Sequence, residues 1–134
     1  MNDTHIFAGI RVLIIEDEAL VSMMLEEFLE QIGCRMVGTA SRLDEAILKA
    51  RSLPLDMALL DVNLAGEASF PVAEILTARD IPFIFVTGYG PLGLPADMRH
   101  IPVLAKPFQM ARRRDADGGL LIGAVDTSFR QLLG

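Results

Sequence analysis

The stretch M-A-L-L-D-V-N at residues 57–63 decides the fold, because its apolar residues run directly into an aspartate, Asp61. Such a short apolar run is typical of a strand buried on both faces of a sheet. Three other apolar runs also end in polar residues: 12–15 in Glu16 and Asp17, 83–86 in Thr87, and 101–105 in Lys106. Ligands of open parallel sheets bind outside the carboxyl ends of the strands. We therefore expect these polar residues to converge on one pocket.

The expected pocket has a consistent chemistry. Two carboxylates about 4 Å apart repel each other by roughly 4 kcal/mol at an effective dielectric of about 20. A divalent cation would relieve that repulsion, and hard oxygen ligands suit Mg²⁺ or Mn²⁺. Lys106 and Thr87 supply a cation and a hydroxyl that can hold a phosphoryl group, and a carboxylate can be the nucleophile that receives it.

Four motifs in this order resemble the receiver domain of two-component response regulators. They are E-D-E at 16–18, L-L-D-V-N at 59–63, F-V-T-G-Y-G at 85–90 and K-P-F at 106–108. The resemblance implies an α/β fold, a doubly wound, flavodoxin-like, five-stranded parallel sheet with the order 2-1-3-4-5. The T-G-Y-G loop is similar to that of a subset of mostly stand-alone receivers.

The resemblance also implies a role for each site residue. Asp61 would be the phosphoacceptor, and Thr87 and Lys106 would hold the phosphoryl group. The metal residues would be Asp17 as a direct ligand, Glu16 through water, Asp61, and Asn63. Asn63 would supply its backbone carbonyl, a role that depends little on its side chain.

The implied function is a phosphorelay step rather than turnover of a substrate. A sensor histidine kinase or histidine phosphotransfer protein would donate the phosphoryl group to Asp61 in a Mg²⁺-dependent step. The protein would promote only its own phosphorylation and dephosphorylation, so it is not expected to be an enzyme. A chain of 134 residues fits one domain, so we expect the output to be contact with a downstream protein.

Alternating elements support the same fold. Residues 19–32 carry an apolar stripe at helical spacing, and Gly33 is placed to end that helix. Ser41 with Asp44 resembles a capping box for a second helix, and Pro71 is placed at the first position of a third. Alternating strands and helices predict a parallel sheet with right-handed crossovers.

The output regions depart from the commonest receiver pattern. Val103 occupies the position where many receivers carry an aromatic switch residue. Two interpretations of Tyr89 stay open: a switch residue acting with Thr87, or an exposed loop aromatic. The glycines and prolines of 90–95 predict a short or displaced fourth helix.

Three segments are expected: an N-terminal tail at 1–10, a receiver core at 11–108, and an atypical C-terminal segment at 109–134. Arg112–Arg114 and Gly118-Gly119 interrupt the expected last helix. Apolar spacing recovers over 117–133, which predicts a displaced helix or one exchanged in a homodimer. The arginines suit either a solvated linker or an acidic partner.

Composition limits the remaining classes of function. The net charge of −6 argues against nucleic-acid binding. No apolar run approaches the roughly 18 residues of a membrane span, and residues 1–9 lack a secretory signal pattern. The single cysteine, Cys34, fits a buried hydrophobe in a reducing cytoplasm.

Each signal alone has an ordinary explanation. The acids at 16–18 suit the start of a helix, Asp61 suits a loop, Thr87 a turn, and Lys106 an exposed strand end. A single shared site explains these residues better than four unrelated coincidences at four strand ends. Two other classes stay open: a pseudo-receiver that is never phosphorylated, and an Asp-dependent phosphohydrolase similar to haloacid-dehalogenase-like enzymes. The latter place the nucleophile near the first strand, whereas Asp61 lies on the third.

Overall fold

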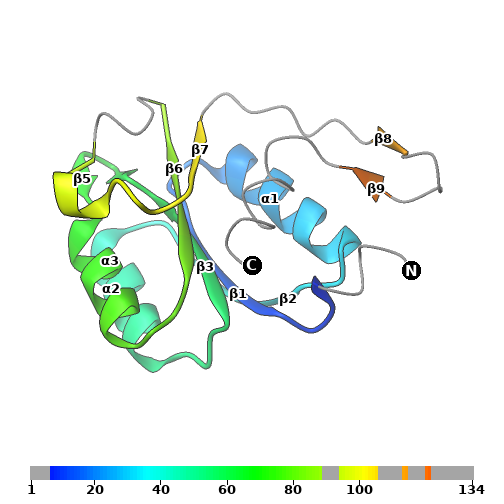
Figure 1. The fold of residues 1–134 in the computed structure, drawn as a ribbon, viewed down its shortest axis with the longest axis horizontal. Helices are drawn as coiled ribbons and strands as arrows, with labels where there is room; N and C mark the ends of the chain where they lie inside the picture. The colour runs from blue at the N-terminus through cyan, green and yellow to red at the C-terminus, as the bar shows by residue number, and fades with distance from the viewer. Residues whose placement is uncertain (1–6, 89–93, 106–112, 115–119, 122–134) are drawn as a thin grey trace.

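Five parallel strands form one sheet in a computed structural model that describes residues 7–88, 94–105, 113–114 and 120–121 (Figure 1). The order is β2-β1-β3-β6-β7, with bounds Arg35–Ala40, Arg11–Ile15, Met57–Asp61, Phe83–Thr87 and Val103–Ala105. Numbered within this sheet alone, that order is 2-1-3-4-5, so the prediction is confirmed.

Helices cover both faces of the sheet. Helix α1 (Ala19–Gln31) lies on one face, and α2 (Leu43–Ser52) and α3 (Phe70–Ala78) lie on the other (Figure 1). Successive strand residues alternate between the two cores because strand side chains have a period of two. The core on the α1 face includes Val12, Ile14, Met57, Leu59, Ile84 and Val86. The opposite core includes Leu13, Ile15, Ala58, Leu60, Phe83 and Phe85. This two-sided burial explains why the strands read as continuous apolar runs.

Helix α1 ends as its sequence predicts. Gly33 has φ +92°, a conformation that glycine adopts without steric cost. The Gly33 N–H donates to the Glu30 carbonyl over 3.1 Å, and the Cys34 N–H donates to the Leu29 carbonyl over 2.9 Å. These two bonds form a Schellman motif, which turns the chain into β2.

The predicted starts of two other helices are shifted by one position. Arg42 is the N-cap of α2, and the Ser41 N–H donates to Glu45 Oε1 over 2.9 Å, so the capping box of Ser41 and Asp44 was wrong. Glu45 is the acid that reaches back because it occupies the third position of the helix. Pro71 is the second residue of α3 rather than the first.

A short hairpin joins β3 to α3. It pairs β4 (Asn63–Leu64) with β5 (Glu67–Ala68) in antiparallel register. The two residues of its turn, Ala65 and Gly66, have φ +51° and +91°. Nothing in the apolar pattern predicted this hairpin.

The ends of the predicted core differ in detail from expectation. Phe7 is 1% exposed and packs in the core on the α1 face, although it belongs to the predicted tail. Residues 94–102 contain one short 3-10 helix, η3 (Ala96–Met98), consistent with a short fourth helix.

The described part of the C-terminal segment is extended. Strand β8 (Arg113–Arg114) pairs antiparallel with β9 (Leu120–Leu121), so the predicted helix over 117–133 was wrong at Leu120 and Leu121. In the sequence, Gly118-Gly119 directly precedes Leu120, and glycine is unfavourable inside a helix. The rest of 117–133 lies outside the described residues. Among the helices described, none combines the length and apolar character needed to cross a membrane.

Candidate functional site

Strand register brings the predicted acids and the threonine to one edge of the sheet. Ile15 pairs with Leu60, so Glu16 follows β1 beside Asp61, the last residue of β3. Asp61 in turn pairs with Val86, and Thr87 is the next residue. Glu16, Asp61 and Thr87 are 4%, 4% and 3% exposed. Buried polar side chains at three neighbouring strand ends mark this edge as the candidate site.

Three consecutive carboxylates form the acidic part of the site. Glu16, Asp17 and Glu18 each offer an oxygen within 4.8 Å of the others. The Glu18 N–H donates to Glu16 Oε2 over 3.0 Å, which orients the buried glutamate. Sequence analysis gave Glu18 no ligand role, and its only signal was the third letter of the E-D-E motif.

Asp17 is held in its charged form. Burial raises its pKa, but the bond from the Ala65 N–H and the neighbouring side chains of Asp61 and Glu16 lower the pKa more, so the net shift is downward. The Ala65 N–H donates to Asp17 Oδ2 over 3.0 Å. The side chains of Asp17, Asp61 and Glu16 therefore form one cluster of carboxylates.

Asn63 contributes its side chain as well as its backbone. Its N–H donates to Asp61 Oδ1 over 3.1 Å, and its own Oδ1 accepts the Gly66 N–H over 2.8 Å. The first bond orients the Asp61 carboxylate, and the second closes the hairpin turn. This structural role of the Asn63 side chain is separate from the predicted role of its backbone carbonyl as a metal ligand, which stays a prediction.

The donor set fits a hard divalent cation. Glu16, Asp17 and Asp61 supply only carboxylate oxygens, the ligands that Mg²⁺ prefers in proteins. Acids packed this closely at a partly buried edge also call for a compensating positive charge. These three residues, with the backbone carbonyl of Asn63, would hold the ion.

Two predicted residues lie outside the described part of the chain. Lys106 directly follows β7, whose Ala105 pairs with Thr87. Tyr89 follows Gly88 beyond the end of β6. Their predicted roles as phosphate-binding and switch residues stay predictions. Val103 lies on β7. It occupies the position where many receivers carry an aromatic switch residue.

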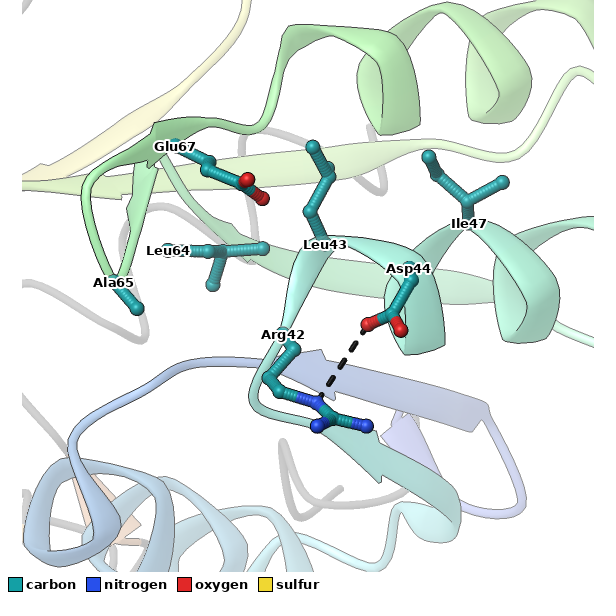
Figure 2. A pocket seen from close by; sticks show the side chains of 7 residues that line it. All are labelled: Arg42, Leu43, Asp44, Ile47, Leu64, Ala65 and Glu67. Atoms are coloured by element: carbon teal, nitrogen blue, oxygen red, sulfur yellow. Dashed lines mark ion pairs between the residues drawn. The ribbon is translucent and has the colours of Figure 1, made fainter.

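A groove borders the hairpin. Figure 2 shows it between the start of α2 and the hairpin. Its volume is about 520 Å³. Its lining residues are Arg42, Leu43, Asp44, Ile47, Leu64, Ala65 and Glu67. Arg42 and Asp44 form an ion pair of 3.6 Å on one wall. None of the predicted site residues lines the groove, but Ala65 borders both places.

Cys34 plays no part in the site. It is buried in the core on the α1 face, and burial raises its thiol pKa to about 11. A thiol with so high a pKa is a poor nucleophile at neutral pH, as predicted.

Comparison with known proteins gives a consistent family. The profile described as the response regulator receiver domain matches residues 12–116. The phyllosphere-induced regulator PhyR of Methylorubrum extorquens is 36% identical over 105 residues, which cover 75% of this chain and 39% of PhyR. PdtaR, a transcriptional regulatory protein of Mycobacterium tuberculosis, is 33% identical over 75% of this chain and 51% of its own length. The chain thus spans about half or less of these relatives.

Among solved structures, SdrG matches this chain over nearly its whole length. The solution structure of SdrG from Sphingomonas melonis Fr1 is 42% identical, with a TM-score of 0.75, and covers 94% of this chain and 98% of SdrG. The BeF3-activated conformation of SdrG is similar as well, with 41% identity, a TM-score of 0.72, and coverage of 95% and 98%.

Proposed function

Because this chain belongs to the response regulator receiver domain family of two-component systems, we propose that Asp61 accepts a phosphoryl group from a histidine kinase or histidine phosphotransfer protein. The observation that carries this proposal is the geometry of Asp61. Its carboxylate is buried at the end of β3, accepts the Asn63 N–H, and lies with two further acids at the same edge.

In the proposed step, a carboxylate oxygen of Asp61 attacks phosphorus. A P–O bond forms, the P–N bond of the phosphohistidine breaks, and the imidazole nitrogen leaves with the electron pair. Mg²⁺ held by Glu16, Asp17, Asp61 and the Asn63 carbonyl would offset negative charge on the phosphoryl oxygens. The Asn63 N–H keeps the Asp61 carboxylate oriented, and the Thr87 hydroxyl and the Lys106 ammonium would bind the transferred group.

The output would follow from the same contacts. A bond from Thr87 to the phosphoryl group would draw the end of β6 toward Asp61 and change the loop that carries Tyr89. This is a local charge event that biases a two-state element. The receiver core of 11–108 would then signal through contact with a downstream protein in the cytoplasm, with 109–134 as an atypical segment that supports a homodimer.

Intact mass after incubation with acetyl phosphate tests the proposal. We expect a gain of one phosphoryl group that needs Mg²⁺, is labile in base, and is lost in Asp61→Asn. Asp80→Asn is the matched control, because Asp80 follows α3 at the opposite end of the sheet and asparagine tolerates its φ of +57°. A folded, Mg²⁺-binding protein that gains no mass would instead support the pseudo-receiver function.

A further inference from the structure

The hairpin after β3 is bonded to two of the acids at the site. At its base, the Asn63 N–H donates to Asp61 Oδ1 over 3.1 Å. At its tip, the Ala65 N–H donates to Asp17 Oδ2 over 3.0 Å. The turn between them is closed by the bond from the Gly66 N–H to Asn63 Oδ1, of 2.8 Å. One four-residue segment therefore bridges the predicted phosphoacceptor and a predicted metal ligand.

The conformation of the turn is unfavourable without this bridge. Ala65 has φ +51°, a region that alanine avoids because its Cβ approaches the following carbonyl. Such strain persists where the surrounding structure over-determines it. A hydrogen bond to a charged carboxylate is stronger than one between neutral groups, and the Ala65 N–H makes such a bond to Asp17.

We propose that the Ala65–Gly66 turn is a positioning element that holds the Asp17 carboxylate in the orientation needed to bind a divalent cation. This inference rests on the proposed function, because that function assigns the cation to Asp17. The Ala65 N–H fixes one oxygen of the carboxylate, so less side-chain freedom is lost when an ion binds. Outer hydrogen bonds of this kind tune metal affinity in many sites.

The coupling is reciprocal by thermodynamic linkage. If the turn raises the affinity of Asp17 for the ion, the bound ion must stabilise the turn by the same factor. Leu64, Ala65 and Glu67 also form one wall of the groove in Figure 2. Occupation of the site would therefore also stabilise the residues that form this wall.

The test weakens the turn without touching any acid. Gly66 has φ +91°, and a Cβ built there meets no atom within 4 Å, so Gly66→Ala strains only the backbone. Gly9→Ala is the matched control: Gly9 has φ +77° and equally open space, but it precedes β1 at the other end of the sheet. We expect both variants to lose similar thermal stability. Mg²⁺ affinity, measured by calorimetric titration, should fall about fivefold or more in Gly66→Ala and stay within about twofold in Gly9→Ala.

Hydrogen exchange gives a second measurement on the unsubstituted chain. The Ala65 amide should exchange several-fold more slowly with saturating Mg²⁺ than without it. Equal Mg²⁺ affinities in the two glycine variants, or an exchange rate that Mg²⁺ leaves unchanged, would overturn the positioning role alone. A chain that binds no Mg²⁺ at all would overturn the proposed function together with this inference.

Discussion

The Glu18→Gln variant tests whether the acid that sequence analysis overlooked contributes to the metal site. The substitution removes one of three charges whose oxygens lie within 4.8 Å of one another. It keeps the Glu18 backbone N–H, which donates to Glu16 Oε2, so the orientation of the buried glutamate should survive. Because the side chain of Glu18 is exposed at the start of α1, we expect the fold to be unaffected.

The size of the effect follows from Coulomb's law. Taking 4.8 Å, the limit within which these oxygens lie of one another, as the distance to the ion, a unit charge acting on a divalent charge contributes roughly 1.7 kcal/mol at the dielectric of water. Screening at physiological ionic strength reduces this to about half. The range corresponds to Mg²⁺ binding that is weaker by about fourfold to twentyfold.

Calorimetric titration with Mg²⁺ at two ionic strengths measures this effect. Glu30→Gln is the matched control, since Glu30 is exposed on the same helix about 18 Å further along its axis. The difference between the two variants should shrink at high salt, because screening weakens the charge interaction. If Glu18→Gln binds Mg²⁺ as tightly as Glu30→Gln at low salt, the charge of Glu18 does not act on the ion and the reasoning is wrong.

Three further predictions concern stability and reactivity. Gly33→Ala should destabilise the protein more than Gly9→Ala, as measured by urea unfolding. Both substitutions place alanine at positive φ, but only a Cβ at Gly33 lies as close as 3.3 Å to a backbone atom, the Cα of Ala8. Arg11 lowers the pKa of Asp56 to about 2. The stabilisation of the fold by this ion pair should therefore be present above about pH 4 and lost as pH falls towards 2. The gap in unfolding midpoint between the natural chain and Asp56→Asn should therefore close over that interval. Cys34 should react with iodoacetamide at pH 8 only slowly until the protein is unfolded, because burial raises its pKa to about 11.

The sheet and the convergence of its polar residues were predictable because both are encoded locally. Strands β1, β3 and β6 are short apolar runs that stop at residues of the candidate site, as at Asp61 and Thr87. Parallel pairing then brings the strand ends together without any further information from the sequence. The family resemblance supplied the strand order, which periodicity alone leaves open.

Helix starts were less predictable because neighbouring residues compete for the same role. Asp44 and Glu45 are both acids in the first turn of α2. The choice between them depends on where the backbone enters the helix, at Arg42, and Glu45 is the acid that bonds to the Ser41 N–H. A one-residue shift changes the capping partner while leaving the apolar pattern of the helix unchanged.

The hairpin was missed for a different reason: its turn violates the local rule that would have identified it. Two-residue hairpin turns with positive φ at both positions favour asparagine, aspartate or glycine, and Ala65 is none of these. The compensating acceptor, Asp17, lies 48 residues earlier in the chain, so no window of local sequence contains both partners. A local preference that is broken and then offset by a distant charged group is expected at functional sites. Ala65 therefore explains why the hairpin was not predicted, and its N–H makes the contact between the hairpin and Asp17.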